Sequence, residues 1–481
     1  MHRMSQAALL AVVAVLATLL SLGPSRVTPA RASEPGVGAP SPVYRYWNAT
    51  YADWRSVPVQ GSQPDPAQLA QQGYGQYPTP QFFVDMIGND GMVAVYRWWQ
   101  PDDQDWVDVV EGQPSDDQML AWGYTGRTFQ WYAYATPRPD TVAVYRWWQP
   151  DDRDWVTLRD QEIPDATMRT NGYERKTFLF YASAERSPDG GTGYFPLGPV
   201  QSSVLDDPAW AGGAHPHTFS VQDVNAAGDQ GVNQGHRYLG YVGTNDCAGI
   251  GIARSDDLNA AKWSQDTTPL FTDGDRWAST LVDGGSRIDL VDNVHYCSAN
   301  YGIVGRVSTD GLNGTRFTAP RPLVQESDHA NGNPTLFRDP ASGRVYLYWW
   351  RQDGAMYDIR VKSAATFDDL LQTSPADIGQ RLVYSPERIA APQVMAVDGT
   401  YYLAVESYES GNVWKTRVLT SASPTGPFSE IPGNPVYGDG SACVFQQVFG
   451  GELHTYYCHQ ATAGDDSTWT LDHVTAKLTG S

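Results

Sequence analysis

The 481-residue sequence predicts an all-β protein with two differently organised domains. Short runs rich in aromatic and β-branched residues, such as "RVYLYWW" and "TYYLAVES", are bounded by Gly, Asp, Asn and Pro, as strands are. No long segment with helical periodicity follows the first 32 residues. Two sets of internal repeats lie on either side of the Gly-rich stretch 187–193, which we interpret as a linker.

The first 32 residues are typical of a secretory signal peptide. Arg3 precedes the small and apolar run 7–22, and Ala30-Arg31-Ala32 is an A-x-A cleavage pattern. The run is short for a spanning helix, which needs about 20 apolar residues, so a membrane anchor is the less favoured alternative. We therefore expect a secreted, extracellular protein in which 33–41 is a linker.

The charge of the chain restricts its partners. The sequence carries 33 Lys and Arg against 54 Asp and Glu, and removing residues 1–32 removes three Arg and no acid. Nucleic acids and anionic membranes require a basic surface, so neither is expected as a partner. We expect a monomer that binds a polysaccharide or an oligosaccharide.

All four cysteines lie beyond residue 240, and an even number in an exported protein predicts two disulfides. Cys443 and Cys458 flank a predicted hairpin and are paired on that ground, which leaves Cys247 with Cys297. No cysteine or histidine spacing is typical of zinc. We expect no cofactor; a structural calcium ion is compatible with the fold predicted below, but the sequence shows no recognisable ligand set for it.

The first domain, 42–186, consists of three repeats. The segment "VAVYRWWQPDD" occurs at Val93–Asp103 and Val142–Asp152, and "VYRYWNATYADW" at Val43–Trp54 is a weaker copy. Each repeat continues with Asp-Trp, then Gly-Tyr, then an aromatic strand, and the period is about 50 residues. Units of this length bury their apolar faces against one another, and three of them suit a pseudo-threefold β-trefoil.

These repeats resemble an uncharacterised family of secreted bacterial repeats with the approximate pattern VYRxxNxxxxDHFYT…GYxxEGxxFYA. The resemblance covers 42–184 and implies a trefoil-like module attached to an exported enzyme. This chain departs from the pattern by having Asp-Trp where the family has Asp or His followed by Phe-Tyr. The departure affects the expected ligand more than the expected fold.

The repeated tryptophans have two interpretations. Adjacent residues of a strand face opposite ways, so one of Trp98 and Trp99 should be buried and the other exposed, and the same holds for the copy at 147–148. The tryptophans therefore form a core, or they also bind sugar, whose apolar face matches a flat indole. Trp106 and Trp155, each beside an Asp, are the candidate ligand contacts.

The second domain, 194–481, has a weaker repeat. Five strand-like segments recur at separations of 62, 55, 59 and 50 residues, around Thr218, Thr280, Thr335, Val394 and Val444. Most are followed by two further strands, the last of which ends in a turn that contains serine. Units of about 55 residues with four short strands are typical of propeller blades. The sequence thus predicts a five-bladed β-propeller.

The same segments resemble glycoside hydrolase family 43 and its furanosidase and arabinanase relatives. "APQVMAVDGTYYLAVES" resembles their EGPxVxKxDGxYYLxYS strand, and "SASPTGPF" resembles their SxSPxGPF turn. The resemblance spans 193 to the C-terminus. It implies a glycosidase with an Asp base, a second Asp that orients the substrate, and a Glu acid near the propeller axis.

All three family positions differ in this chain. His215-Pro216-His217 stands where the base is expected, Asn333 stands where the second Asp is expected, and Ala390 stands where the acid is expected. The family mechanism therefore cannot be carried over residue by residue.

Other carboxylates must supply the chemistry if the chain is an enzyme. Glycoside hydrolysis needs a protonated and an ionised carboxyl, roughly 5 Å apart for retention or 6.5–9.5 Å for inversion. Glu387 is the predicted acid because it lies five residues before Pro392, although its neighbour Arg388 suits a base better. Asp328 is the predicted ionised partner and Asp275 the reserve. Glu406, in an apolar strand that favours a protonated carboxyl, is a third possibility for the acid.

Several residues near the strand starts are suited to bind sugar. Arginine and histidine donate to hydroxyl groups, and tryptophan stacks beneath a sugar ring. The predicted substrate-binding residues are His215, His217, Arg276, Trp277 and Asn333.

Two functions remain open. One is a secreted glycoside hydrolase acting on a polysaccharide of pentose or furanose type, and the other is a non-catalytic carbohydrate- or cell-surface-binding protein.

Overall fold

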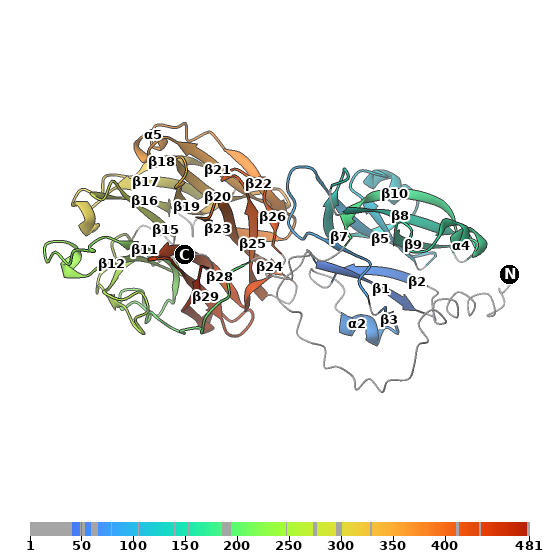
Figure 1. Cartoon of the computed structure of the whole chain (residues 1–481), viewed down its shortest axis with the longest axis horizontal. Helices are drawn as coiled ribbons and strands as arrows, with labels where there is room; N and C mark the ends of the chain where they lie inside the picture. The colour runs from blue at the N-terminus through green and yellow to red at the C-terminus, as the bar shows by residue number, and fades with distance from the viewer. Residues whose placement is uncertain are drawn as a thin grey trace. The chain divides into compact units, whose positions relative to one another are not determined.

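The computed structural model describes residues 41–478, apart from short gaps at 49, 51–52, 59–65, 78, 104, 139–140, 152, 185–193, 247, 273–276, 295–300, 328–329, 410–412 and 432–433. Within the described residues, one compact unit comprises 41–84 and 91–184, and the other comprises 85–90 and 194–478 (Figure 1). The predicted signal peptide, nearly all of the first linker and the second linker lie outside the described residues. No described helix is long and apolar enough to cross a membrane.

The first unit contains three copies of one supersecondary motif. Each copy is an antiparallel hairpin, a six-residue helix and a closing strand, which is split in the first copy. The hairpins are β1 (Ser41–Asn48) with β2 (Asp53–Pro58), β5 (Met92–Gln100) with β6 (Asp105–Val110), and β8 (Thr141–Gln149) with β9 (Asp154–Arg159). The helices are α2 (Pro66–Gln71), α3 (Asp116–Ala121) and α4 (Asp165–Thr170), and the closing strands are β3 (Gly75–Gln76), β4 (Phe82–Val84), β7 (Thr125–Tyr134) and β10 (Glu174–Ser183).

The short helices are an addition to the predicted all-β pattern. The second begins at Ser115, whose hydroxyl accepts from the Gln118 backbone while the Gln118 side chain accepts from the Ser115 backbone. This reciprocal capping satisfies amide groups that the first turn would leave unpaired. Because this helix buries only Met119, its sequence has no apolar stripe by which a helix could be predicted.

Strand alternation buries one tryptophan of each duplicated pair, as predicted, but the neighbour is not exposed. Trp98 is buried, whereas Trp99 is only partly buried and faces Trp106 across the hairpin, with ring centroids 4.9 Å apart. Trp147 and Trp148 repeat this arrangement, with Trp148 packed on Trp155. The neighbour of each buried tryptophan is thus covered by a second indole.

The second unit is a five-bladed β-propeller, as predicted. Its blades follow one another in chain order, from green to red in Figure 1. Blades one to three are β11 (Pro216–Asp223), β12 (Tyr238–Thr244), β13 (Ile250–Ser255) and β14 (Ser264–Gln265); β15 (Ala278–Asp283), β16 (Arg287–Val294), β17 (Tyr301–Val307) and β18 (Arg321–Ser327); and β19 (Asn331–Arg338), β20 (Val345–Asp353), β21 (Met356–Ala364) and β22 (Gln380–Ser385). Blade four is β23 (Arg388–Val397), β24 (Thr400–Glu409), β25 (Val413–Ser421), β26 (Ser429–Glu430) and β27 (Val436–Asp439), and blade five is β28 (Ser441–Phe449), β29 (Glu452–Gln460) and β30 (Trp469–Lys477). Between strands lie a short helix, α5 (Phe367–Leu370), and the 3-10 turns η1 (Asn233–Gly235), η2 (Gly311–Asn313) and η3 (Asp466–Thr468).

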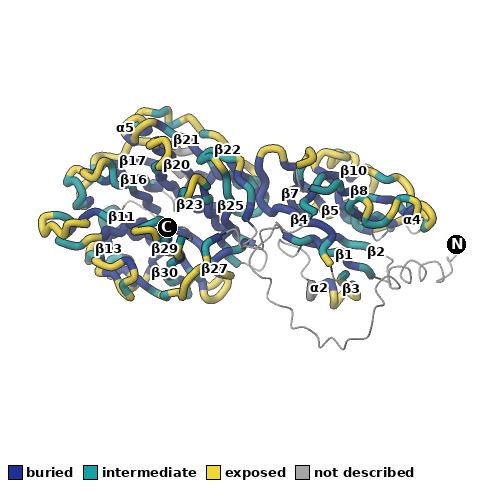
Figure 2. The backbone as a smooth tube through the Cα atoms, viewed as in Figure 1, coloured by how far each residue is buried: buried dark blue, intermediate teal, exposed yellow. Residues whose placement is uncertain are grey.

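The ring closes between the last blade and the first. The inner strands contact one another in the order β11, β15, β19, β23, β28, and β28 returns to β11. Leu197 and Gln201 form bridges to β30, so the beginning of the unit extends the edge of blade five. Most residues of these inner strands are buried and the others are partly buried (Figure 2).

Four of the five inner strands are interrupted by a bulge at the same level. The register of pairing shifts between Pro216 and Thr218, Gly332 and Thr335, Ala390 and Gln393, and Ala442 and Phe445. Within three of these bulges a residue has positive φ: Asn333 (48°), Ala391 (48°) and Cys443 (52°). A bulge leaves a residue unpaired and redirects its side chain, which is how such distortions serve functional sites.

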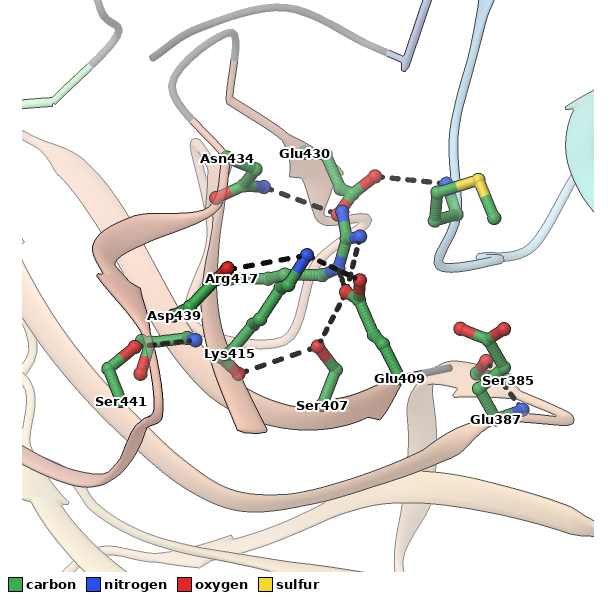
Figure 3. A network of polar contacts seen from close by, with 12 residues as sticks. Ser385, Glu387, Ser407, Glu409, Lys415, Arg417, Glu430, Asn434, Asp439 and Ser441 are labelled. Atoms are coloured by element: carbon green, nitrogen blue, oxygen red, sulfur yellow. Dashed lines mark hydrogen bonds and ion pairs between the residues drawn. The ribbon is translucent and has the colours of Figure 1, made fainter. Parts of the chain in front are cut away.

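Blade four is held by a buried ion network. Figure 3 shows the Arg417 guanidinium between Glu409 and Glu430; its Nη2 lies 2.6 Å from Glu409 Oε1, and its Nη1 lies 3.0 Å from Glu430 Oε1. The other oxygen of Glu430 accepts from the backbone amide of Met86 at 3.0 Å. All three charged side chains are buried, so each depends on the others for compensation. The network ties together the strands that carry one side of the site described next.

Candidate functional site

A polar cavity of about 200 Å³ lies beside the bulges of the inner strands. Its walls come from blades one, three, four and five and from the loop that follows β12. The lining residues are His217, Asn245, Asn333, Arg388, Glu406, Trp414, Ala442, Asp466 and Trp469. Two carboxyls, cationic and amide donors, and two indoles therefore face one space.

Glu406 is the most deeply placed carboxyl of this cavity. It lies on β24 directly opposite Ala390, the position at which the sequence comparison expected a glutamate. Its Oε2 accepts a hydrogen bond from the backbone amide of Cys443 at 3.0 Å and lies 3.5 Å from the Cys443 sulfur. The side chain is only 5% exposed, and the cavity is its route to solvent.

Asp466 provides the second carboxyl, from the exposed η3 turn. Its Oδ1 accepts from the indole Nε1 of Trp469 at 3.1 Å and from the Gln460 amide at 3.3 Å. Across the cavity, the guanidinium of Arg388 lies 5.0 Å from the ring centroid of Trp414. Sequence reasoning missed Asp466, Trp414 and Trp469. A strand pattern shows which face of the sheet a residue is on, but not how far it lies from the axis of the propeller.

His217 lines the cavity, as predicted, and has an unexpected neighbour. Its Nε2 lies 3.0 Å from Cys443 Sγ, and the ring packs edge-on against Trp469 with centroids 5.2 Å apart. Cys458 is also adjacent, with its thiol on the His217 carbonyl oxygen. The ligand atoms of the three side chains all lie within 4.8 Å of one another, and all three residues are buried.

The predicted disulfide between Cys443 and Cys458 is wrong, because the structure has no bond between their two sulfurs. The residue opposite Cys458 in the strand pairing is Ala442. The bulge that follows Ala442 turns Cys443 towards His217 and Glu406 instead. The other predicted pair, Cys247 and Cys297, lies outside the described residues.

Asn333 also lines the cavity, but its side chain is engaged. Its Oδ1 accepts from the indole Nε1 of Trp350, and its backbone amide donates to Asn293 Oδ1 at 2.8 Å. His215 lies off the cavity: its Nδ1 is 2.9 Å from Asp207 Oδ1, and its backbone amide donates to Asn245 at 3.0 Å. His215 thus positions a lining residue without being one.

The remaining predicted residues do not converge on this cavity. Trp277 is buried in the apolar core between blades one and five. Glu387 is partly buried in the turn between β22 and β23, where its charge acts on Arg417, and its backbone amide donates to Ser385 at 3.1 Å. It does not line the cavity. Asp275, Arg276 and Asp328 lie outside the described residues.

A larger cavity of about 490 Å³ lies along the opposite ends of the inner strands. Apolar and amide side chains make up most of its walls, and Asp223 is the only carboxylate among its described lining residues. Cleavage of a glycosidic bond needs two carboxyls, so the smaller cavity is the better candidate despite its size.

In the first unit, Trp106 and Trp155 have covered rings. Trp106 packs on Trp99, and the Arg55 guanidinium lies 5.0 Å from its ring centroid; Trp155 packs on Trp148, with Arg146 at 4.8 Å. The aspartates that precede the three hairpin tryptophans meet instead: Asp53, Asp105 and Asp154 are buried, with one carboxylate oxygen of each within 4.8 Å of the others. Burial raises the pKa of Asp105 well above its ordinary value.

Comparison with known proteins gives one family match and several solved structures that are similar to the chain. Residues 42–183 match the family described as a domain of unknown function, DUF5648. No curated protein matches the chain. Solved structures similar to it include Bacillus subtilis levansucrase (TM-score 0.43, 11% identity, 57% of this chain and 88% of that one), a family 43 glycoside hydrolase from Xanthomonas citri (0.40, 16%, 56% and 90%) and the catalytic domain of a family 62 α-L-arabinofuranosidase from Coprinopsis cinerea (0.43, 16%, 59% and 98%).

Proposed function

We propose that the protein is a secreted glycoside hydrolase that cleaves a polysaccharide of pentose or furanose type in the cavity lined by Glu406 and Asp466. The observation that supports this most directly is the pairing of a buried and an exposed carboxyl in one polar cavity that also contains two indoles. The substrate class rests on the resemblance of the propeller strands to family 43 sequences.

In this proposal Glu406 is the proton donor. It transfers its proton to the glycosidic oxygen as the bond from that oxygen to the anomeric carbon breaks. Asp466, held in place by Trp469 and Gln460, is the ionised partner. It accepts a proton from the water that attacks the anomeric carbon, or it attacks that carbon itself before water releases the sugar. In the first route, exchange with solvent then returns a proton to Glu406 and removes one from Asp466. In the second, Glu406 accepts a proton from the water that releases the sugar, so both carboxyls regain their starting states.

The other lining residues suit a sugar in that position. Arg388 and Asn245 supply donors for hydroxyl groups. Trp414 and Trp469 supply flat apolar surface for the carbon face of a ring. The first unit, trefoil-like in our interpretation, would hold the polysaccharide through Trp122, which is 57% exposed at the end of α3.

The test is sugar release by the purified mature chain from Ser33 on arabinan, xylan, arabinogalactan and fructan. Glu406→Gln and Asp466→Asn should each lower the rate by about 100-fold or more, as expected for loss of an acid or a base. Asp398→Asn is the matched control: this residue lies exposed in the turn between β23 and β24, and its positive φ of 49° suits asparagine equally well. Release that persists in both variants would reject these two carboxyls.

A second candidate function is carbohydrate binding without catalysis. It is favoured because none of the three positions where the family has a carboxylate holds one: they are His215, Asn333 and Ala390. The side-chain oxygen of Asn333 is also engaged, since it accepts a hydrogen bond from Trp350. No release from any glycan, together with retention of the protein on one insoluble glycan, would favour this alternative over hydrolysis.

A further inference from the structure

We propose that His217, Cys443 and Cys458 form a binding site for one zinc-class transition metal ion at the base of the polar cavity. The ligand atoms of the three side chains lie within 4.8 Å of one another, and the His217 Nε2 to Cys443 Sγ distance is 3.0 Å. This site is separate from the two carboxyls of the proposed hydrolysis, and it does not depend on that function.

The spacing of these atoms suits a single ion. Zinc binds thiolate sulfur at about 2.3 Å and imidazole nitrogen at about 2.0–2.1 Å in tetrahedral geometry, so neighbouring ligand atoms sit roughly 3.5–4 Å apart. The 3.0 Å contact is shorter than this value, and the 4.8 Å limit on the other separations includes it. Binding would therefore require the contact between His217 and Cys443 to open by roughly 0.5–1 Å.

The backbone explains why these distant residues meet. Strand β11 of blade one contacts β28 and β29 of blade five, where the ring closes. The bulge in β11 frees His217 from strand pairing, and the bulge in β28 frees Cys443, which has φ 52°. Cys458 lies on the adjacent strand, opposite Ala442. The two bulges and the regular strand thus bring His217, Cys443 and Cys458 close together.

The type of ligand identifies the class of metal. Two sulfurs and an imidazole favour zinc and other soft or borderline ions, whereas calcium and magnesium favour oxygen. Two thiolates would neutralise a divalent ion, so the charges of this buried group would balance. Water from the cavity can supply the fourth ligand, beside Glu406, whose Oε2 lies 3.5 Å from the Cys443 sulfur. His217 lines the cavity, which gives the ion a path of entry.

Metal binding also accounts for two thiols this close together in a chain expected to be exported. Neighbouring thiols in an oxidising compartment form a disulfide unless another bond protects them. Zinc holds cysteines as thiolates, and zinc is not itself redox-active. The competing chemistry is oxidation of the pair, in which the two sulfurs form a bond and lose two electrons and two protons to an external oxidant.

The experiment measures metal and thiols in the mature chain from Ser33, purified without reductant or chelator. We expect about one zinc ion per chain by mass spectrometry of the native protein and by elemental analysis. Peptide mapping should show Cys443 and Cys458 reduced and alkylated only after a chelator removes the metal. Replacement by cobalt should give intense thiolate-to-cobalt absorption, a readout that requires no variant.

Cys443→Ser, Cys458→Ser and His217→Gln should each abolish stoichiometric zinc. His215→Gln is the matched control, because this histidine is two residues away and binds Asp207 instead. A metal-free chain with a Cys443–Cys458 disulfide would overturn the proposal. So would a reduced chain that takes up no zinc on dialysis against it. Neither result depends on glycosidase activity, so the two proposals can fail separately.

Discussion

Ala390 and Glu406 face each other across β23 and β24. Side chains directly opposite in an antiparallel pair have Cβ atoms about 4.5–5.5 Å apart, so they project into the same region. In the proposed function, the carboxylate that the family resemblance expects at 390 is supplied from the neighbouring strand. A linear comparison of motifs sees a missing glutamate, whereas the sheet shows one displaced by a single strand.

The first prediction separates the sequence-based acid from the structural one. Glu387→Gln should leave sugar release unchanged, because Glu387 lies off the cavity and its charge acts on Arg417. The measurement is the initial rate on the glycan that the wild-type chain cleaves best. A loss as large as that of Glu406→Gln would restore Glu387 as the acid.

The second prediction concerns the ion network of blade four. Arg417→Met should lower the free energy of unfolding by about 3–5 kcal/mol, because it leaves the buried Glu430 without its cation and Glu409 with Lys415 alone. Urea denaturation of the mature chain measures this. Adding Glu409→Gln and Glu430→Gln to the same chain should recover most of the loss, and failure to do so would mean that arginine packing, not charge, is what stabilises the blade.

The third prediction is a pH dependence of stability from Asp289, which is 0% exposed on β16. Burial raises the pKa of Asp289 from 3.8 to about 7, against the opposing effect of Arg287. Between pH 3.8 and pH 7, Asp289 holds a proton in the folded chain and releases it in the unfolded chain. The contribution of Asp289 to the free energy of unfolding is therefore greatest at low pH and is lost as the pH rises towards 7. A shift of about 3 pH units corresponds to at most about 4 kcal/mol.

Urea denaturation at pH 4.5 and pH 7 tests this, using wild type and Asp289→Asn. The variant should gain stability relative to wild type at pH 7 and lose that advantage at pH 4.5. Asp398→Asn, an exposed change of the same kind, should show no such difference. Equal pH profiles for wild type and Asp289→Asn would mean that Asp289 stays ionised in the fold.

The fourth prediction concerns carbohydrate binding by the first unit. Trp122→Ala should weaken retention on an insoluble glycan by about tenfold, which is about 1.4 kcal/mol, because an exposed indole provides the stacking surface. Leu120→Ala is the matched control, since Leu120 is apolar and also 57% exposed. Depletion of protein from solution by the glycan measures both. An equal loss in the two variants would indicate a general apolar contact instead of stacking.

The covered tryptophans should behave differently from Trp122. Trp106 packs between Trp99 and Arg55, so its removal would reduce stability more than sugar binding. This difference could not be read from the repeats, because the burial of an indole depends on what the next repeat places over it. Arg55 belongs to the first repeat and covers a tryptophan of the second.

The sequence by itself determined the repeats and therefore the architecture. Three units of about 50 residues and five units of about 55 follow from local periodicity, and the alternation that buries Trp98 follows from strand geometry. The tertiary structure alone decided the site. Cys443 meets His217 because a bulge turns it out of the sheet where the ring closes, and Glu406 lies opposite Ala390 because their strands are paired. Periodicity encodes which way a side chain faces within its own strand, whereas proximity between blades depends on closure of the whole ring.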